Sequence, residues 1–274
     1  MIELAKQAIY RSQGSEALAL AEEAQKIYRS MGANAPNIEM ANAMTGIGHS
    51  LKELNRVEEA VKALDGAIEL LREGSYPFVV DSLRTKASWL VEAGQYESAV
   101  ETFLEAIQAN EIDGEGEFFA RDLLALSFCY SKMSRWQEVI EHAMRARENF
   151  KREKLVDEVA WCDVQVAIAY AELGNSEFAL DIGTRAYHLG DLRNHLAIKC
   201  HAAFVIGKAL GINSQFEEAE RRLQEAREIV SGSNDWEMVT RVEREFINLY
   251  LAQGKVEAAD EVERRLKSLQ EVVE

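Results

Sequence analysis

Proline and cysteine are scarce in this sequence. It has two prolines in 274 residues. Because proline interrupts helices and marks loops and strand edges, its scarcity favours long helices. The three cysteines, Cys129, Cys162 and Cys200, form no Cys-x-x-Cys pair and have no histidine at metal-ligand spacing. This arrangement argues against a disulfide framework or a zinc site, and it indicates reduced thiols in a cytoplasmic protein.

Basic charge and long apolar runs are also lacking. The 31 basic residues are outnumbered by 47 acidic ones, which gives a net charge of −16. Such a chain repels phosphate, so we expect no direct binding to nucleic acid. The most apolar stretch, residues 201–212, is interrupted by Lys208 and is too short to span a membrane. Residues 1–6 lack the pattern of a signal peptide. We therefore expect a cytoplasmic location and no membrane partner.

The main feature that is present is an internal repeat of about 40 residues. Turn-forming residues recur at spacings of 41, 39, 40, 40, 40 and 40, at Gly14, Asn55, Gly94, Ser134, Gly174, Ser214 and Gly254. Five residues after each turn the side chain is small: Ala19, Ala60, Ala99, Val139, Ala179, Ala219 and Ala259. Twelve residues after it, alanine occupies five of seven positions: Lys26, Ala67, Ala106, Ala146, Ala186, Ala226 and Leu266. Tyrosine or leucine stands four residues before every turn.

This pattern predicts a stack of helix hairpins. A first helix ends at the turn residue, and a second helix begins two or three residues later. Two small residues seven apart lie on one face of the second helix and allow the first helix to approach closely. One hairpin cannot bury its apolar stripe alone, so neighbouring hairpins must share a continuous core. We expect a single all-α domain of about seven helix-turn-helix repeats, at residues 1–33, 34–74, 75–113, 114–153, 154–193, 194–233 and 234–274.

At these residues the chain resembles the tetratricopeptide-repeat (TPR) family. The matching elements are the turn glycine, the aromatic residue after it (Tyr96, Trp136 and Phe216) and the two alanines of the second helix. The family's first-helix glycine survives at Gly48 and Gly207. The period near 40 rather than about 34 is similar to that of bacterial regulatory TPR proteins of the MalT-like and peptide-receptor groups. The resemblance implies a right-handed α-α superhelix whose first helices line the concave surface.

The resemblance also implies a set of partner-binding residues. Concave positions would fall 13, 10, 6 and 3 residues before each turn, and these 28 positions hold seven basic residues and one acidic residue. A basic groove with an apolar centre would bind an acidic peptide or protein segment. The predicted residues are Asn42, Thr45, His49, Lys52, Arg84, Ser88, Arg121, Phe128, Trp161, Val164, Ile168, His201, Phe204, Lys208, Arg241, Arg244 and Asn248.

Other interpretations of these residues remain open. A shift of one residue in register would move some of them into the core, and Phe128 and Trp161 suit a core as well as a contact surface. Arg244 and Asn248 have the spacing of the clamp by which some family members hold a C-terminal carboxylate, but they stand in the last repeat. We do not infer that function.

No pattern of catalytic or metal-binding residues is found. The acidic segment 111–117 lacks the glycine and terminal glutamate of a calcium loop and is interpreted as a turn between repeats. Gly46-Ile47-Gly48 lies within a predicted helix, where glycine serves packing rather than phosphate binding. Nucleophile-elbow and Walker sequences are missing too. We therefore expect a protein that is not an enzyme and uses no cofactor or metal.

Three functions fit the sequence. The first is a non-catalytic scaffold that binds an acidic peptide or protein segment in the concave groove. The second is a regulatory sensor in which a small ligand or signalling peptide changes oligomerisation or partner binding. The third is a structural subunit of an assembly. The last helix, residues 255–274, carries apolar residues such as Val262 and Leu266. These residues suit either a cap on the stack or a homo-oligomeric contact.

Overall fold

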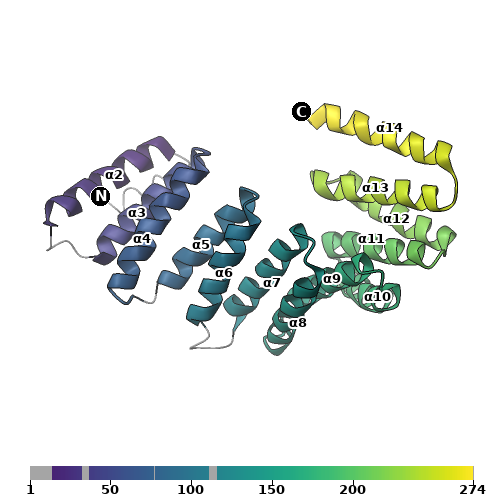
Figure 1. Cartoon of the computed structure of the whole chain (residues 1–274), viewed down its shortest axis with the longest axis horizontal. Coiled ribbons are helices and arrows are strands. Elements are labelled where there is room, and N and C mark those ends of the chain that lie inside the picture. Colours follow the sequence, from purple (N-terminus) through teal and green to yellow (C-terminus); the bar gives the residue numbers. More distant parts are fainter. Residues whose placement is uncertain (1–13, 33–36, 77, 111–115, 274) are drawn as a thin grey trace. The chain divides into compact units, whose positions relative to one another are not determined.

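The described part of the chain consists of helices joined by short turns. The computed structural model describes residues 14–32, 37–76, 78–110 and 116–273, and these contain thirteen helices and no strand (Figure 1). The predicted all-α solenoid of helix hairpins is confirmed. None of the helices in these ranges has the length and apolar content needed to cross a membrane.

The chain divides into two compact units, Met1–Gly114 and Glu115–Glu274. Their division falls next to the predicted boundary between the third and fourth repeats. Unit 1 contains α2 (Gly14–Ser30), α3 (Asn37–Glu53), α4 (Val57–Glu73), α5 (Val79–Glu92) and α6 (Tyr96–Asn110). Unit 2 contains α7 (Glu117–Lys132), α8 (Trp136–Arg152), α9 (Val156–Glu172), α10 (Ser176–Leu192), α11 (Leu196–Ile212), α12 (Phe216–Ser231), α13 (Trp236–Ala252) and α14 (Val256–Val273).

Each hairpin turn has the same backbone conformation. In the described hairpins the predicted turn residue has a left-handed φ, from 56° at Ser134 to 75° at Gly174, even where it is not glycine. In the α9–α10 turn, the amide of Gly174 donates to the carbonyl of Ala171 at 3.0 Å, and the amide of Asn175 donates to Tyr170 at 2.8 Å. These two bonds satisfy carbonyls at the helix end, as in a Schellman motif. Asparagine, serine and glycine recur at the turns because they tolerate this φ.

Small residues sit where paired helices approach each other. The predicted small positions in the second helices are buried: Ala60, Ala67, Ala99, Ala106, Val139, Ala146, Ala179, Ala186, Ala219, Ala226 and Ala259. Gly207 of α11 faces one of them, because a Cβ atom added to it would lie 3.1 Å from the carbonyl oxygen of Ala219 and 2.8 Å from Cγ of Leu223. The small residues five and twelve positions after each turn therefore lie where paired helices are in contact.

Replacing Gly207 by alanine is expected to lower the free energy of unfolding by about 1–3 kcal/mol, since the new methyl group has no room. The matched change Gly46→Ala in α3 meets only the Cβ of Ala21 at 3.6 Å. It is expected to raise stability by about 0.5 kcal/mol through helix propensity. Urea denaturation followed by circular dichroism measures both values. Equal effects of the two substitutions would contradict the close approach at Gly207.

The alignment of the first repeat is wrong. Ala19 and Lys26 were predicted to face the neighbouring helix, yet both are exposed, whereas Ala17 and Ala24 are buried. Gly14 was predicted as the turn, but it is the first described residue and is already helical. The pair Ala17 and Ala24 has the same seven-residue spacing as the predicted pair, so spacing alone could not choose between them. The preceding residues, 1–13, lie outside the described ranges.

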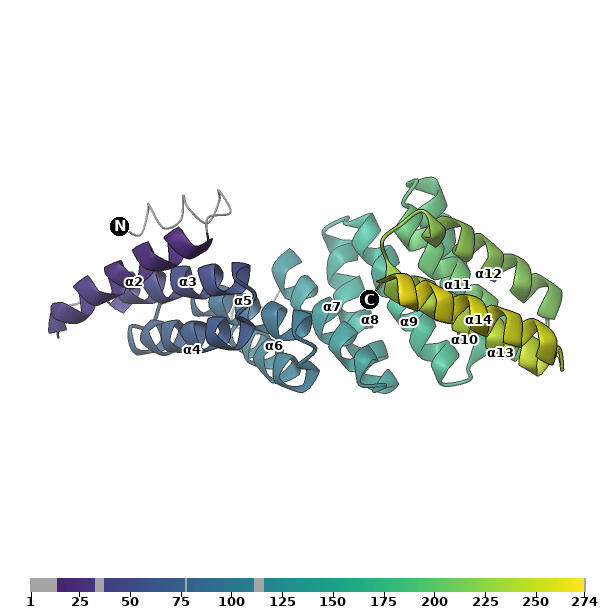
Figure 2. The ribbon, with the colours of Figure 1, turned by 90° about the horizontal axis from the view of Figure 1, so that it is seen from above.

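The last helix packs on its own unit. α14 lies beside α13 (Figure 2). Val262 and Leu266 of α14 are buried. These two apolar residues therefore belong to the packed interior of unit 2. At the start of α13, the carboxylate of Asp235 accepts a hydrogen bond from the backbone amide of Met238 at 2.9 Å and so caps the helix.

Two buried carboxylates join consecutive repeats in unit 2. Asp163 of α9 accepts from Nε of Arg147 of α8 at 2.6 Å, and Arg185 of α10 lies 3.7 Å away. Eighty residues later the arrangement recurs: Glu243 of α13 accepts from Arg227 of α12 at 2.6 Å and lies 3.9 Å from Arg265 of α14. Each carboxylate lies between an arginine of the preceding repeat and one of its own repeat. The sequence analysis missed these sites.

Candidate functional site

The first helices of unit 2 form its inner face. α9 packs directly against α7 and α11, and α11 against α13, whereas no two second helices of this unit, as far as they are described, make comparable contact. Helices that approach more closely on one side of a stack make that side concave. The Nζ of Lys132 at the end of α7 pairs with Glu237 at the start of α13, which lies three repeats on. We call the surface of α7, α9, α11 and α13 the inner face.

The predicted binding residues fall in both units. In unit 1, α3 and α5 carry six of them: Asn42, His49 and Ser88 are exposed, and Thr45, Lys52 and Arg84 are half-buried. The ring of His49 lies edge-on to Trp89, with centroids 5.1 Å apart. The other eleven residues belong to unit 2, and their arrangement there is more informative.

Three predicted contact residues belong to the core. Val164 has no exposed surface, and Phe204 and Ile168 expose 3% and 5%, so the prediction that they face a partner is wrong. α9 and α11 stand in the middle of the stack and are covered on most sides by neighbouring helices. Their accessible strip is therefore narrower than the spacing rule assumes. Phe128 and Trp161 are half-buried and keep part of their surface on the inner face.

Several of the basic residues predicted for the groove form ion pairs with carboxylates. Lys208 donates to Glu172 at 2.6 Å and lies 3.8 Å from Glu245. Arg121 donates to Glu117, which is 2.8 Å away, and to Glu158 at 3.0 Å. Two further pairs are Lys52 with Glu92 and Arg84 with Asp81, the latter at 3.2 Å.

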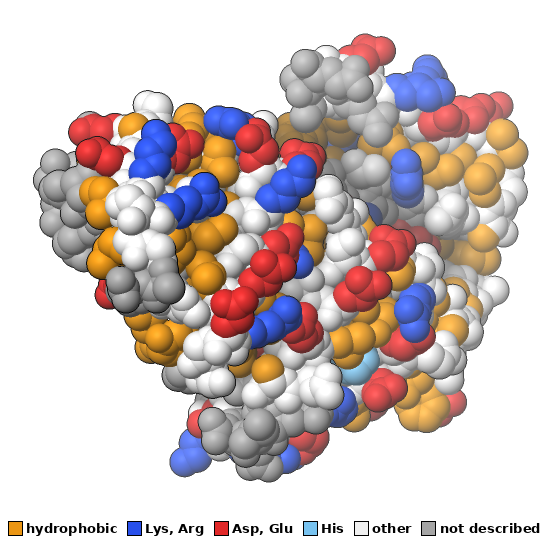
Figure 3. Space-filling view, turned by 60° about the vertical axis from the view of Figure 1, so that its left-hand side comes forward, with side chains coloured by type: hydrophobic (Ala, Val, Ile, Leu, Met, Phe, Trp, Pro, Cys, Tyr) orange, Lys and Arg blue, Asp and Glu red, His pale blue; other side chains and the backbone are white. Residues whose placement is uncertain are grey.

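Asp81 was the one acidic residue among the 28 counted positions, and the other matching acids stand outside those positions. Glu117 and Glu237 lie 17 residues before their turn residue, and Glu92 and Glu172 lie two before theirs. These positions are at the ends of the first helices, and from there Glu92 and Glu172 reach lysines of neighbouring repeats. Figure 3 likewise shows acidic and basic side chains interspersed on one face of the molecule. A uniformly basic surface is therefore not present at these residues.

An aromatic cluster occupies the middle of the inner face. The ring of Trp161 lies edge-on to His201, with centroids 5.1 Å apart, and to His195 at 6.1 Å. The Nδ1 of His195 accepts a hydrogen bond from the amide of Ile198 at 3.4 Å, which caps α11 and fixes the imidazole. Burial, together with the nearby Arg241, lowers the pKa of His201 to about 4, so its ring is neutral at pH 7.

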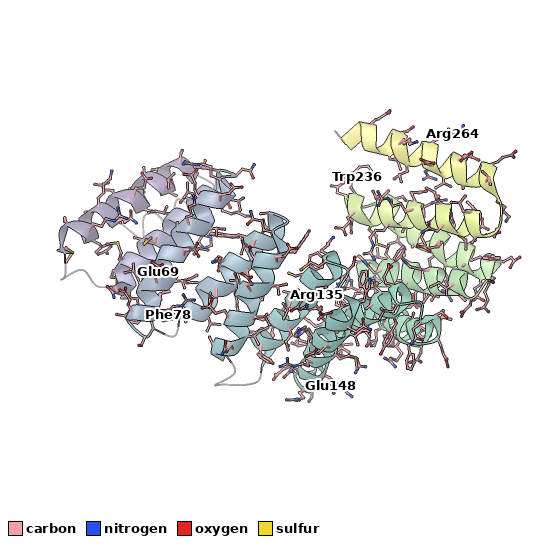
Figure 4. The ribbon with its side chains drawn as sticks, viewed as in Figure 1. Glu69, Phe78, Arg135, Glu148, Trp236 and Arg264 are labelled. Carbon is pink, nitrogen blue, oxygen red and sulfur yellow. The ribbon has the colours of Figure 1, made fainter. Side chains whose placement is uncertain are left out.

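Arg241 and Lys132 complete the surroundings of this cluster. The guanidinium of Arg241 lies over the ring of Phe204, 4.9 Å from its centroid, and Lys132 lies over Phe128 at 5.0 Å. Cations held on aromatic rings in this way are fixed in position. At the start of α13, Trp236 projects from the helix (Figure 4) and is exposed. Lys132, His195, Glu237 and Trp236 were not among the predicted residues.

The thiols and carboxylates offer no catalytic or metal centre in the part that is described. All three cysteines are buried and unpaired, and burial raises the pKa of Cys129 to about 11 and that of Cys200 to about 12. Thiols of this kind are poor nucleophiles at pH 7. Within the same residues, no group of three His, Cys, Asp or Glu side chains is arranged to hold a metal ion. Most of the acidic segment 111–117 lies outside the described ranges.

The comparisons with known proteins agree with the hairpin geometry. A family model described as tetratricopeptide repeat matches residues 39–111. Residues 39–111 therefore carry the tetratricopeptide repeat. The crystal structure of the apo form of RapI has a similar fold, with a TM-score of 0.76 at 14% identity over 99% of this chain and 97% of that one.

Two further solved structures resemble this TPR protein. A Rap protein complexed with Competence and Sporulation Factor gives a TM-score of 0.67 at 14% identity, over 97% of this chain and 74% of that one. A STAND protein with a tetratricopeptide repeat sensor, from Pyrococcus horikoshii, gives 0.73 at 16% identity, over 99% of this chain and 42% of that one. A search of curated proteins found no match. At these identities the likeness shows the fold alone.

Proposed function

We propose that this TPR protein is a non-catalytic scaffold that binds a peptide or protein segment on the inner face of unit 2. The observation that carries the proposal is the aromatic cluster of Trp161, His195 and His201, partly exposed in the middle of that face. Aromatic side chains supply large contact area at little cost in conformational entropy, and they dominate the binding energy of many interfaces.

The surroundings of the cluster support the same proposal. Ion pairs such as Lys208–Glu172 and Arg121–Glu158 join neighbouring first helices of the same face. A polar rim around an aromatic centre is the usual composition of a binding surface. Because the first helices are fixed by the core beneath them, little ordering is needed when a segment binds. The crystallised Rap protein of similar fold was complexed with Competence and Sporulation Factor.

The second candidate function is a sensor in which a bound signalling peptide changes oligomerisation or partner affinity. The observation that favours it is the similarity in fold to RapI and to the sensor of the STAND protein. In that case a peptide selected for binding to the inner face would change the sedimentation coefficient of the protein. An unchanged sedimentation coefficient at saturation would leave the scaffold as the function.

Replacing Trp161 by alanine is expected to weaken the binding of selected peptides about tenfold or more, because an aromatic side chain at the centre of an interface contributes most of its energy. The probes are twelve-residue peptides selected from a random display library on the immobilised protein, and fluorescence anisotropy measures their affinity.

The matched control is Phe178→Ala on the second helix α10, because Phe178 is an exposed aromatic residue stacked on Tyr170 at 5.2 Å. It is expected to leave the affinity unchanged. If Phe178→Ala weakens binding and Trp161→Ala does not, the selected peptides bind elsewhere and the proposed surface is wrong. Circular dichroism of both variants shows that they are folded.

A further inference from the structure

Arg241 differs from the other half-buried cations of the inner face. Lys132 and Lys208 each pair with at least one carboxylate. Among the described residues Arg241 forms no hydrogen bond or ion pair; its guanidinium lies over the ring of Phe204 and acts through its charge on His201 and Glu245. Arg244 on the same helix also has no ion pair within the described chain, but its side chain is exposed and well solvated. Arg241 is half-buried, so its hydrogen-bonding groups are only partly hydrated.

The carboxylates that could neutralise Arg241 are engaged elsewhere. Glu237 and Glu245 stand four residues before and after it on α13, at the spacing of helical ion pairs. Glu237 pairs instead with Lys132 of α7. Glu245 lies 3.8 Å from Lys208 of α11 and accepts a hydrogen bond from the side-chain amide of Asn248 at 3.4 Å. Two lysines of other repeats thus draw both flanking carboxylates away and leave the guanidinium open.

Two uncharged rings lie beside Arg241. Phe204 lies beneath the guanidinium, and the neutral ring of His201 lies close enough to feel its charge and contacts Trp161 in turn. A carboxylate that reached Arg241 would therefore form a charge-assisted hydrogen bond beside an aromatic surface, where such bonds are stronger than in bulk water.

We propose that Arg241 is the anion anchor of the inner face, and that it receives a single carboxylate of the bound segment while a neighbouring apolar side chain of that segment lies against Trp161. This inference rests on the proposed function and adds the chemistry that is recognised. Glu237, Glu245 and Asp235 stand close by on or next to α13, and their negative charge disfavours a doubly charged phosphate. A carboxylate, with one negative charge shared by two oxygens, suits one open guanidinium.

Lys132 is a positioning residue in this proposal. Lys132 binds the carboxylate of Glu237. Glu237 is therefore kept from pairing with Arg241, which stands four residues later on α13. If Lys132 were replaced by methionine, Glu237 would be released and would compete with the carboxylate of the ligand. The effect of Lys132 should therefore depend on the presence of Glu237.

The probe is an array of twelve-residue peptides with a central phenylalanine followed, one to four positions later, by glutamate, glutamine or lysine. Each peptide is made with a C-terminal carboxylate and with a C-terminal amide, which separates the two sources of a carboxylate. We expect the labelled wild-type protein to prefer carboxylate-bearing peptides about tenfold over their amidated glutamine counterparts. Arg241→Gln should abolish this preference and retain binding of the neutral peptides, while the matched control Arg244→Gln should retain both.

The outcomes separate the inference from the proposed function. If glutamine and glutamate peptides bind equally well and Trp161→Ala weakens both, the scaffold function stands and the role of Arg241 is wrong. Loss of the preference in Arg244→Gln but not in Arg241→Gln would also overturn it. If no peptide of the array binds, both proposals fail.

A double-mutant cycle tests the role of Lys132. In the wild-type background Lys132→Met should weaken the glutamate peptide about tenfold, and in the Glu237→Gln background it should have little effect. An equal loss in both backgrounds would mean that Lys132 acts through its own charge, which contradicts the positioning role. Thermal unfolding of each variant confirms that the comparison is made between folded proteins.

Discussion

Glu243→Ala is expected to lower the free energy of unfolding by about 3–5 kcal/mol. The carboxylate of Glu243 exposes 2% of its surface and accepts from Arg227 at 2.6 Å. Removing it leaves the guanidinium of Arg227, which lies 3.7 Å from the ring centroid of Phe246, without its charge partner in a largely apolar site. An uncompensated buried charge costs far more than the loss of one exposed ion pair.

Urea denaturation of the whole protein, followed for each variant, measures this loss of stability. The matched control is Glu59→Ala, because Glu59 and Arg56 form an exposed pair three residues apart on the surface of unit 1, and no measurable change in stability is expected there. Replacing both partners, Glu243→Leu with Arg227→Met, should restore most of the stability, since the double variant buries no charge. A single-variant cost as small as that of Glu59→Ala would contradict a buried clamp.

The recurrence of this arrangement suggests that it fixes how the repeats stack. Asp163 and Glu243 stand eleven residues before Gly174 and Gly254, respectively, and each contacts arginines of two successive second helices. The equivalent position in the intervening repeat is Ala203, which belongs to the apolar core. Asp163→Ala should therefore lower the free energy of unfolding as much as Glu243→Ala does, because each carboxylate lies between two arginines in the same arrangement.

The sequence predicted the hairpins well because their rules are local. A turn residue with left-handed φ, such as Gly174, and a small residue five positions later, such as Ala179, are fixed by contacts within one hairpin. Periodicity therefore located six of the seven turns. In the first repeat, Ala17 and Ala24 gave the same spacing as Ala19 and Lys26, and local rules could not distinguish the two alignments.

The candidate site was predicted less well because it depends on contacts between repeats. The pairing of Lys132 with Glu237 joins residues 105 positions apart, and no spacing rule within a repeat reveals it. Counting one face of each first helix gave an excess of basic charge, since the matching acids lie at the helix ends. The burial of Val164 and Phe204 also follows from neighbouring repeats, which cover α9 and α11 on both sides.

His201 is expected to make the protein less stable as the pH falls from about 6.5 to about 4. Burial lowers the pKa of His201 to about 4, and the charge of Arg241 acts in the same direction, while Asp235 and Glu237 oppose it. The unfolded chain takes up a proton near the ordinary value of about 6.5. Between these values the unfolded state binds more protons than the folded state, so the free energy of unfolding decreases as the pH is lowered.

The size of the effect follows from the shift of the pKa. At pH 4.5 the loss from this one group is about 2–3 kcal/mol relative to pH 7.5. Burial lowers the pKa of His142 as well, in the same direction, so wild-type protein shows the sum of these effects and carboxylate protonation. The variant His201→Gln isolates the contribution of His201, because glutamine does not titrate. Its free energy of unfolding should fall about 2–3 kcal/mol less over this range.

Urea titrations at pH 7.5, 6.5, 5.5 and 4.5 measure the difference, and His188→Gln on the exposed surface of α10 serves as the matched control for the loss of a histidine. Fluorescence offers an independent readout, since the ring of His201 lies edge-on to Trp161 and its protonation changes the surroundings of that indole. A parallel pH dependence in wild type and His201→Gln would mean that His201 titrates normally in the folded protein. That result would contradict the statement that the imidazole of His201, next to Arg241 in the aromatic cluster, stays neutral in the folded protein.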